Sequence, residues 1–381
     1  MSQWDDLRVY YDLYLREWLQ RFSLPPLPIL LALLAGAVIV FLLWKSRSNY
    51  EKLGQLEPAP EGFQPPVTVV IPARDEAANI AAVVACFPGL PVIVVDDGSS
   101  DKTAELARAA GATVIAAPPL RADHKGKPNA CAAGAKLAQS GWILFVDADT
   151  RYEPGAAAAL VYFAEKNHLD AVSMFLRQER LTFWERLLLP FADALYFSAV
   201  DGKRLNRTKS SDALANGQCF LVSREVYELT GGHSAVLEAV LDDIALARHL
   251  KHCRKRLRVI RGERFGRTRT YHGFHGIWNG IQKSSFRYLM IRPWMGFQVV
   301  MTSLLLLSWL PVLALLLQDE RWVTAAVFAA LPPVLLRKWY GGWREALLAP
   351  VAIYVFQVIA LAGLYHTTFS PETVWKGREV S

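Results

Sequence analysis

Three apolar segments in the first half of the chain each end in a cluster of acidic residues. The run VTVVI leads into PARDE, VIVV into DDGSSD, and WILFV into DADT, all between Val67 and Thr150. Short runs rich in Val and Ile are typical of buried strands. Ligands of open α/β sheets bind where the carboxyl ends of such strands meet. We therefore expect one acidic rim, formed by Asp75, Glu76, Asp96, Asp97, Asp147 and Asp149.

The segments between these strands have the composition of helices. Helix-like stretches lie near 76–87, 101–110 and 126–139, and each one separates two strand-like runs. Regular alternation of strands and helices is typical of an α/β fold with a doubly wound sheet. We predict this fold class for residues 67–270.

The carboxylates of the acidic rim require a positive charge nearby. Carboxylates gathered at one place repel each other, so a cation is expected to offset that repulsion. Hard oxygen ligands favour Mg²⁺ or Mn²⁺. These ions bind through one or two carboxylates and complete their coordination with substrate phosphates. The rim therefore predicts a site for a divalent metal, Mg or Mn, together with a diphosphate ligand.

The composition and one long apolar run indicate a membrane protein. The 381 residues are 52% hydrophobic, at the apolar end of what soluble domains show. Residues 24–44 are nearly free of polar groups and are long enough for a transmembrane helix, which needs about 20 residues. Lys45, Arg47 and Lys52 follow, so the positive-inside rule places the chain after this helix in the cytoplasm. A buried core helix is the alternative.

Three more apolar runs follow the α/β region, at 294–317, 322–336 and 347–365. The first and the last are long enough to span a bilayer. The middle run is short and contains Pro332 and Pro333, so we expect a kinked span or a re-entrant segment. If it spans, the QDER loop lies outside, the basic RKWYGGWR loop lies inside, and both ends of the chain lie outside.

Four segments connect or flank these parts. Residues 1–23 mix aromatic and charged residues, which fits a helix on the membrane surface or an ordinary solvated helix. Residues 45–66 are a polar linker rich in proline. Residues 176–197 and 271–293 combine aromatic, apolar and basic side chains, so we expect amphipathic helices at the membrane interface. A core helix is the alternative for 176–197.

Charge and cysteine content limit the possible partners. Basic residues far outnumber the single acid, Glu263, between Arg248 and Arg269. That run is either a solvated face or a contact with anionic lipid or a phosphorylated ligand. No aromatic–basic motif accompanies it, so we expect no nucleic-acid partner. The four cysteines are scattered without a CxxC pair, which is typical of a reducing compartment.

Six motifs in a fixed order carry a family resemblance. PARDE, DDGSSD, GKPNA, DAD, TGGH and LDDIALA follow one another along the chain. The series resembles the inverting nucleotide-sugar glycosyltransferases of family 2, which have the GT-A fold, from about Val67 to Tyr288. Within that family the chain is similar to the membrane-anchored branch that glycosylates polyisoprenoid-type lipids, such as hopanoid- and carotenoid-associated enzymes. The resemblance implies a GT-A catalytic domain over 67–270 with transmembrane helices at both ends.

The resemblance also implies a donor site at the acidic rim. In the family, the PARDE loop and the first Asp of the DDGS-type loop hold the nucleoside. Lys127 would lie near the diphosphate or the base, Asp149 would bind the metal, and Asp147 would contact the ribose or the metal. An exposed lysine at a helix start and a turn residue or helix cap at Asp97 are the alternatives. An Asp can accept the imide N–H of uracil, which favours a UDP-sugar. The implied donor residues are Pro72, Ala73, Arg74, Glu76, Asp96, Asp97, Lys127 and Asp147.

Inverting transfer needs a base that takes the proton from the acceptor hydroxyl. The position that matches the family's base is Asp243 in LDDI, and Asp242 stands where the family often has Glu. We expect their helix to begin near Glu238, and a helix N-terminus favours a carboxylate. N-terminal capping alone is the alternative role. The loop before this helix would line the acceptor side, through Gly231, Gly232 and His233.

The motif near Gln282 bears on whether the product is a polymer. Family members that make polymers carry Q-x-x-R-W on an interfacial helix, whereas Gln282 is followed by KSSFRY. We therefore expect a single transfer of a sugar, from a UDP-sugar to the hydroxyl or carboxylate of a lipid, at the cytoplasmic face of the cell (inner) membrane. A processive polysaccharide synthase and a non-catalytic membrane protein that binds nucleotide sugars are the alternatives.

Overall fold

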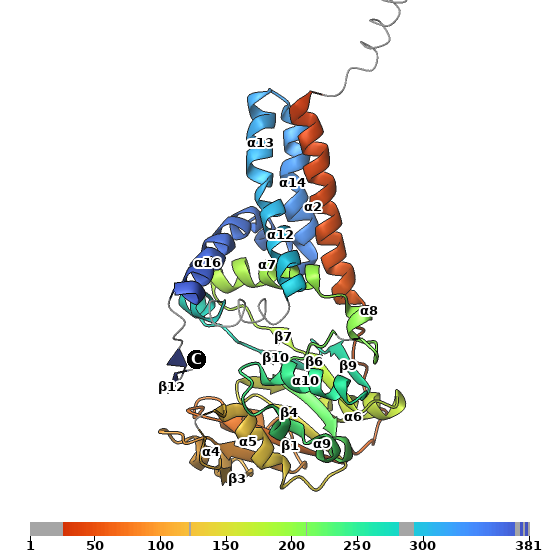
Figure 1. Cartoon of the computed structure of the whole chain (residues 1–381), viewed down its shortest axis with the longest axis vertical. Helices are drawn as coiled ribbons and strands as arrows, with labels where there is room; N and C mark the ends of the chain where they lie inside the picture. The colour runs from red at the N-terminus through yellow and green to blue at the C-terminus, as the bar shows by residue number, and fades with distance from the viewer. Residues whose placement is uncertain are drawn as a thin grey trace, which may run out of the picture.

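The structure is a computed structural model, and it describes most of the chain. The described residues are 26–121, 123–210, 212–281, 293–369, 374–375 and 378–379. The predicted surface helix at 1–23 lies outside them, and so does most of the second half of the segment 271–293. Two parts are visible: an α/β domain and a group of long helices that rises from one side of it (Figure 1).

A seven-stranded mixed sheet forms the centre of the α/β domain. Its strand order is β3-β2-β1-β4-β8-β6-β9. The first four strands in this order are parallel, while β8 runs antiparallel to both β4 and β6. The strands are β1 (Val67–Ala73), β2 (Val92–Asp96), β3 (Thr113–Ala116), β4 (Trp142–Val146), β6 (Ala171–Phe175), β8 (Cys219–Ser223) and β9 (Leu257–Arg261).

The central strands are apolar because both faces of the sheet are covered. All five residues of β4 are buried, and so are the first five of β1; strands that are covered on both sides read as continuous apolar runs. The covering helices are α3 (Ile80–Val84), α4 (Thr103–Ala109), α5 (Gly126–Ala135), α6 (Ala156–Lys166), α9 (Arg224–Thr230) and α10 (Asp242–His252), with a 3₁₀ turn η1 at Gly232–Val236.

Helix α10 differs from expectation in where it begins, and helix α5 packs unusually closely on the sheet. Helix α10 begins at Asp242 rather than near Glu238, because residues 237–241 form an irregular turn after η1 instead. Helix α5 lies directly on β1 and β2. A Cβ added to Gly134 would stand 2.5 Å from a methyl of Val70 and 2.8 Å from one of Val95. This close contact holds the start of α5 at the carboxyl edge of the sheet.

A small second sheet links the α/β domain to the long helices. Its order is β5-β10-β7, with β5 (Thr150–Tyr152) directly after the DAD motif, β10 (Gly266–Thr268), and β7 (Arg177–Gln178) leading to α7. Helix α7 (Phe183–Ala199) starts with a capping box between Thr182 and Glu185. The predicted interfacial helix at 176–197 is therefore a short strand followed by a helix. Figure 1 shows α7 lying across the base of the long helices.

Helix α7 packs against several of the long helices. Helix α2 (Leu27–Glu51) contacts it through Ser46 and Asn49, whose side chains donate to backbone carbonyls of α7. At the end of α14 (Trp322–Tyr340), the hydroxyl of Tyr340 donates to the Leu187 carbonyl at 2.8 Å. These contacts fix the helices directly above the carboxyl edge of the sheet. A further short helix, α8 (Gly202–Leu205), packs against the end of α2.

The upright group contains α2, α13 (Trp309–Gln318) and α14, with α12 (Pro293–Leu307) below α13 (Figure 1). Two helices of the described chain are long and apolar enough to cross a membrane, Leu27–Glu51 and Gly296–Gln318. Length and composition alone make this weak support for membrane insertion. Helix α14 continues through Pro332 and Pro333 as one helix of 19 residues.

The last long helix departs from the expected arrangement. Helix α16 (Ala349–Phe369), which follows α15 (Trp343–Ala346), slants away from the upright group and lies beside α7 (Figure 1). The rings of Phe191 on α7 and Phe356 on α16 pack 5.5 Å apart. Helix α16 therefore does not return to the end of the group where α2 begins, in contrast to the expectation that both ends of the chain lie there. A final strand pair is β11 (Val374–Trp375) and β12 (Arg378–Glu379).

Candidate active site

A cavity of about 1640 Å³ runs along the carboxyl edge of the sheet and continues into the space beside α7. The loops after β1, β2 and β4, the start of α5 and the start of α10 form its polar end. The predicted residues that line it are Pro72, Ala73, Arg74, Glu76, Asp97, Lys127, Asp147, Asp149, Asp242 and Asp243.

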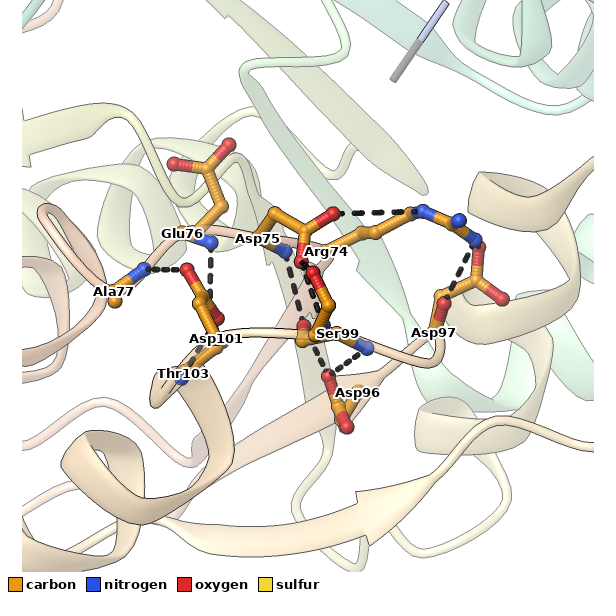
Figure 2. Close-up of polar contacts among 10 residues, drawn as sticks. Arg74, Asp75, Glu76, Ala77, Asp96, Asp97, Ser99, Asp101 and Thr103 are labelled. Carbon is orange, nitrogen blue, oxygen red and sulfur yellow. Dashed lines mark hydrogen bonds and ion pairs between the residues drawn. The ribbon is translucent and has the colours of Figure 1, made fainter. Parts of the chain in front are cut away.

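The PARDE and DDGSSD loops are joined to each other by hydrogen bonds (Figure 2). The backbone N–H of Asp75 donates to Ser99 Oγ at 3.0 Å, and the Asp75 carboxylate accepts from the backbone N–H of Ser100 at 2.7 Å. The backbone N–H of Glu76 donates to Thr103 Oγ1 at 2.8 Å. Asp75 has a φ of +52°, and its carboxylate accepts hydrogen bonds from Ser100 of the neighbouring loop. These bonds leave the Glu76 side chain to face the cavity.

The two carboxylates of the second acidic pair, Asp96 and Asp97, have different surroundings. Asp96 accepts hydrogen bonds from the backbone N–H and the hydroxyl of Ser99, and so closes the turn (Figure 2). Asp97 lines the cavity instead, and Arg74 Nη1 donates to its carbonyl at 3.2 Å. The role of Asp96 in holding the nucleoside stays a prediction.

Lys127 and Asp147 form an ion pair at the start of α5. Lys127 Nζ lies 2.6 Å from Asp147 Oδ1. Burial lowers the pKa of Lys127, but the carboxylates of Asp147 and Asp242 outweigh burial and hold the pKa well above its ordinary value. Lys127 is therefore a permanent cation at a helix N-terminus, a position that attracts phosphate groups.

Asp149 lacks comparable neutralisation. Burial raises the pKa of its carboxyl to about 6, with further increases from the nearby carboxylates of Asp147 and Glu76. A divalent cation beside Asp149 would relieve this repulsion. No group of three or more His, Cys, Asp or Glu side chains in the described part of the chain is arranged to hold a metal alone. The residues fit a metal that takes its other ligands from a diphosphate and water.

Asp243 is held at the start of α10 by backbone donors. Its Oδ2 accepts from the N–H of Gly217 at 2.8 Å, and its Oδ1 accepts from the N–H of Ile244 at 2.8 Å. Burial raises the pKa of Asp243 to about 6, and the charge of Asp242 adds to the increase. A carboxylate with a pKa close to the working pH is suited to general-base catalysis.

Gly217 is a site residue that the sequence reasoning missed. A Cβ at this position would stand 3.1 Å from the Cβ of Asp243 and 3.2 Å from Lys127 Nζ. A side chain here would crowd the two charged groups and disturb the N–H that holds Asp243. The Asn-Gly pair of NGQ was the available signal, because such pairs mark tight turns.

The glycine loop before α10 lies elsewhere than predicted. His233 is 3% exposed and sits behind the carboxylates, in a small space that it shares with Cys131 and Phe145. Gly232 has a φ of +48°, and a Cβ there would stand 2.2 Å from the Tyr227 ring. Gly231, with a φ of +81°, ends α9. This loop is therefore packed against Tyr227, and residues 239–241 line the cavity in its place.

The far end of the cavity is apolar. It is lined by α7, α12 and α16, three helices that meet beside the base of the upright group. Val300, Leu304 and Leu361 line it and are 42%, 52% and 66% exposed. We call this part the apolar arm, defined by Leu189, Ala192, Tyr196, Val299, Val300, Leu304, Phe356, Ala360 and Leu361.

A half-buried ion pair also lines the cavity. Arg180 Nη2 lies 3.2 Å from Asp193 Oδ2, and Arg180 Nη1 donates to the Trp339 carbonyl at 2.9 Å. The side chain of Asp193 is 36% exposed. Burial raises the pKa of Asp193 to about 6, and the Arg180 charge opposes that rise. The sequence reasoning gave neither residue a role.

Comparisons with known proteins agree with this geometry. Residues 68–230 match the family model "Glycosyl transferase family 2". The 4,4'-diaponeurosporenoate glycosyltransferase of Staphylococcus aureus strain MRSA252 is 30% identical over 231 residues, which are 57% of this chain and 60% of the relative. The same enzyme from strain bovine RF122 is 29% identical over 203 residues, 47% of this chain and 50% of the relative. The chain thus spans only part of the length of these relatives.

A solved structure extends the likeness beyond the α/β domain. The mannosyltransferase PcManGT from Pyrobaculum calidifontis, in complex with GDP-Man and Mn²⁺, covers 86% of this chain and 97% of its own, with a TM-score of 0.50 and 18% identity. At this identity the likeness establishes the fold. The predicted α/β, GT-A fold class is confirmed. Residues 68–230 of the α/β domain are thus similar to glycosyl transferase family 2, and the chain is similar to the diaponeurosporenoate glycosyltransferases.

Proposed function

We propose that this protein is a membrane-anchored, inverting glycosyltransferase that moves one sugar from a nucleoside-diphosphate donor to a lipid, at the cytoplasmic face of the cell membrane. The observation that carries the proposal is the single cavity, which joins the carboxylates of the sheet edge to an apolar arm between α7, α12 and α16. A water-soluble donor and a hydrophobic acceptor can meet in such a space.

The donor is assigned to the polar end. Lys127, at the start of α5, would hold the diphosphate, and Asp149 and Asp147 would hold a Mg²⁺ or Mn²⁺ ion. The metal, when bound, would neutralise the charge that develops on the leaving diphosphate. Asp97, beside Arg74, is the carboxylate placed to accept an imide N–H of the base. We propose a UDP-sugar on this ground.

The chemical step is assigned to Asp243. The acceptor oxygen attacks the anomeric carbon from the face opposite the diphosphate, so the new glycosidic bond forms as the bond to the phosphate oxygen breaks. For a hydroxyl acceptor, Asp243 takes the proton that the attacking oxygen loses. An acceptor carboxylate is already ionised and attacks without losing a proton. The N–H groups of Gly217 and Ile244 fix the direction of its carboxylate, and positioning of this kind is what a general base requires.

The acceptor is assigned to the apolar arm. The arm lies among the apolar helices α7, α12 and α16, and its lining residues Val300, Leu304 and Leu361 are exposed, which suits the chain of a lipid. The compound named in the similar Staphylococcus enzymes, diaponeurosporenoate, is a carboxylate. A lipid hydroxyl or carboxyl group near the Arg180–Asp193 pair is the acceptor class that we propose.

The proposal is tested on detergent-solubilised protein with radiolabelled UDP-glucose, UDP-GlcNAc, UDP-galactose and GDP-mannose. Host lipid extract and Mn²⁺ or Mg²⁺ complete the assay. Label that moves into the organic phase, with one sugar per lipid, and stays in water after EDTA would support the proposal. Chains of several sugars would favour a processive synthase instead. Binding of a donor without any turnover would favour a non-catalytic nucleotide-sugar-binding protein.

A further inference from the structure

The side chain of Tyr227 determines where His233 carries its proton. The Tyr227 hydroxyl oxygen accepts from the backbone N–H of His233 at 3.0 Å and lies 2.9 Å from its Nδ1. The hydroxyl has one hydrogen. The oxygen could also accept a second hydrogen bond, but among the hydrogen bonds of the described residues Nδ1 is the one contact to which the Tyr227 hydroxyl can donate. Donation to Nδ1 satisfies this buried hydroxyl hydrogen, and it makes Nδ1 an acceptor without a proton of its own.

The neutral ring must then carry its proton on Nε2. Burial lowers the pKa of His233 to about 3, and the Lys127 charge lowers it further, so the imidazole is neutral at physiological pH. A neutral imidazole holds one N–H. With Nδ1 accepting, that N–H is at Nε2, and Nε2 lies 4.0 Å from Asp242 Oδ2.

The ring has little freedom to turn away from Asp242. Phe145 of β4 packs edge-to-face on it, with ring centroids 4.6 Å apart. Tyr227 of α9 covers another side at 5.7 Å. Gly232 permits this packing, because any Cβ there would overlap the Tyr227 ring. Phe145 of β4, Tyr227 of α9 and the turn at Gly232 thus hold the imidazole with Nε2 on the side of Asp242.

We infer that His233 is a positioning residue, which acts on the base Asp243 through Asp242. Its Nε2–H lies beside the Asp242 carboxylate, at 4.0 Å too far for a hydrogen bond, and its dipole favours that carboxylate at the start of α10 next to Asp243. Lys127, Cys131, Asp147 and Asp243 also interact electrostatically with Asp242. This inference rests on the proposed function, since it assigns a role within that same site.

The test compares two substitutions at His233 in the full-length, detergent-solubilised protein. His233→Gln keeps an N–H close to the position of Nε2, whereas His233→Leu removes it. The matched control is His249→Leu. His249 Nε2 lies 2.7 Å from the Thr230 carbonyl, so its loss removes a comparable contact that faces no carboxylate.

The expected result is a fall in kcat without a change in the donor KM. His233→Leu should lower kcat by about tenfold or more, as does the loss of other partners that orient a functional side chain. His233→Gln should restore most of it, and His249→Leu should leave it near wild type. Tyr227→Phe should lower kcat less, and adding it to His233→Leu should cause no further loss. Equal activity of His233→Leu and wild type, or equal loss in all three single histidine variants, would overturn the inference.

A second measurement is independent of turnover. The imidazole ¹⁵N spectrum of the wild-type protein, assigned through the signals missing in His233→Gln, should show protonated Nε2 and unprotonated Nδ1 across neutral pH. The opposite tautomer would overturn the inference even if transfer is observed. The expected tautomer in a protein that transfers no sugar would instead count against the proposed function.

Discussion

Lys127 Nζ lies 2.6 Å from Asp147 Oδ1, so the cation assigned to the donor diphosphate is already paired within the protein. The two side chains are 30% and 25% exposed, both toward the cavity. The pair offsets part of the repulsion within the acidic rim and prepares a positive helix N-terminus for an anion.

Lys127→Met should weaken donor binding and destabilise the fold. Asp147 would lose its partner, and breaking a fully buried pair costs roughly 3–5 kcal/mol. We expect less than this because both groups are partly exposed. Isothermal titration with UDP and thermal unfolding measure the two effects. Lys136→Met, at the exposed C-terminal end of the same helix, is the control. Unchanged UDP affinity in Lys127→Met would contradict the diphosphate role.

Asp243→Asn should abolish transfer and preserve donor binding. Loss of a general base lowers the rate by about 10²–10⁴-fold, while the UDP site lies on other residues. Single-turnover transfer and UDP titration separate the two. Glu238→Gln is the control, because Glu238 is exposed and precedes α10. Activity that survives in Asp243→Asn but is lost in Glu238→Gln would move the base to Glu238.

The shifted pKa of Asp243 predicts both a rate profile and a stability profile. With a pKa of about 6, the base is ionised only above that pH, so the acceptor transfer rate should fall as pH drops below about 6. Asp242→Asn removes a charge that raises this pKa, whereas Lys127 and the N–H groups of Gly217 and Ile244 still lower it. The acid limb should therefore move to lower pH. An unmoved limb would show that Asp243 is not the titrating group.

The contribution of Asp243 to the folding free energy changes with pH in the direction opposite to that of a salt-bridged carboxylate, whose pKa is lowered by folding. Between about pH 4 and pH 6 the native Asp243 keeps a proton that the unfolded chain releases. Its contribution to folding is therefore most favourable at low pH and is lost as pH rises through this window. Asp243→Asn should be more stable than wild type at pH 7, with a smaller difference at pH 4. Thermal unfolding at the two pH values checks this.

Much of the polar site could be predicted from the sequence because strands and carboxylates adjoin. Asp147 and Asp149 follow β4 directly and both line the cavity, although residues 148–149 form a turn rather than an extended end. The choice between Asp96 and Asp97 could not be predicted. It depends on Ser99, whose backbone N–H and hydroxyl capture the first carboxylate, and loop conformation decides that contact.

Other parts depend on which surfaces pack together, which sequence spacing does not encode. TGGH precedes LDDI closely in the chain, yet His233 packs behind Asp242 because Gly232 lies on the Tyr227 ring. Arg180 lies before α7 and Asp193 lies within it, and they meet where Arg180 also donates to the Trp339 carbonyl near the end of α14. Apolar content alone also did not reveal that α16 slants across α7.

Asp149→Ala should remove the response to divalent metal. Asp149 lies near the carboxylates of Asp147 and Glu76, and their charges together with burial outweigh the Lys127 charge and hold its pKa at about 6. Without it, Mn²⁺ with UDP should no longer raise the unfolding temperature, and transfer should be lost. Asp201→Ala, an exposed cap of α8, should keep both responses. A Mn²⁺-dependent rise in unfolding temperature that persists in Asp149→Ala would contradict the metal role.

Ala192→Trp should discriminate between the apolar arm and the donor end of the cavity. Ala192 lines the arm on α7, so an indole there should exclude a lipid chain and leave the sheet edge unchanged. We expect the lipid KM to rise by at least about tenfold, the scale on which pocket shape discriminates substrates, with the donor KM unchanged. Ala330→Trp, on an exposed face of α14, controls for the added aromatic surface. If both variants or neither raise the lipid KM, the acceptor does not occupy this arm. A rise in donor KM alone would place the sugar nucleotide deeper beside α7 than the carboxylates of the sheet edge indicate.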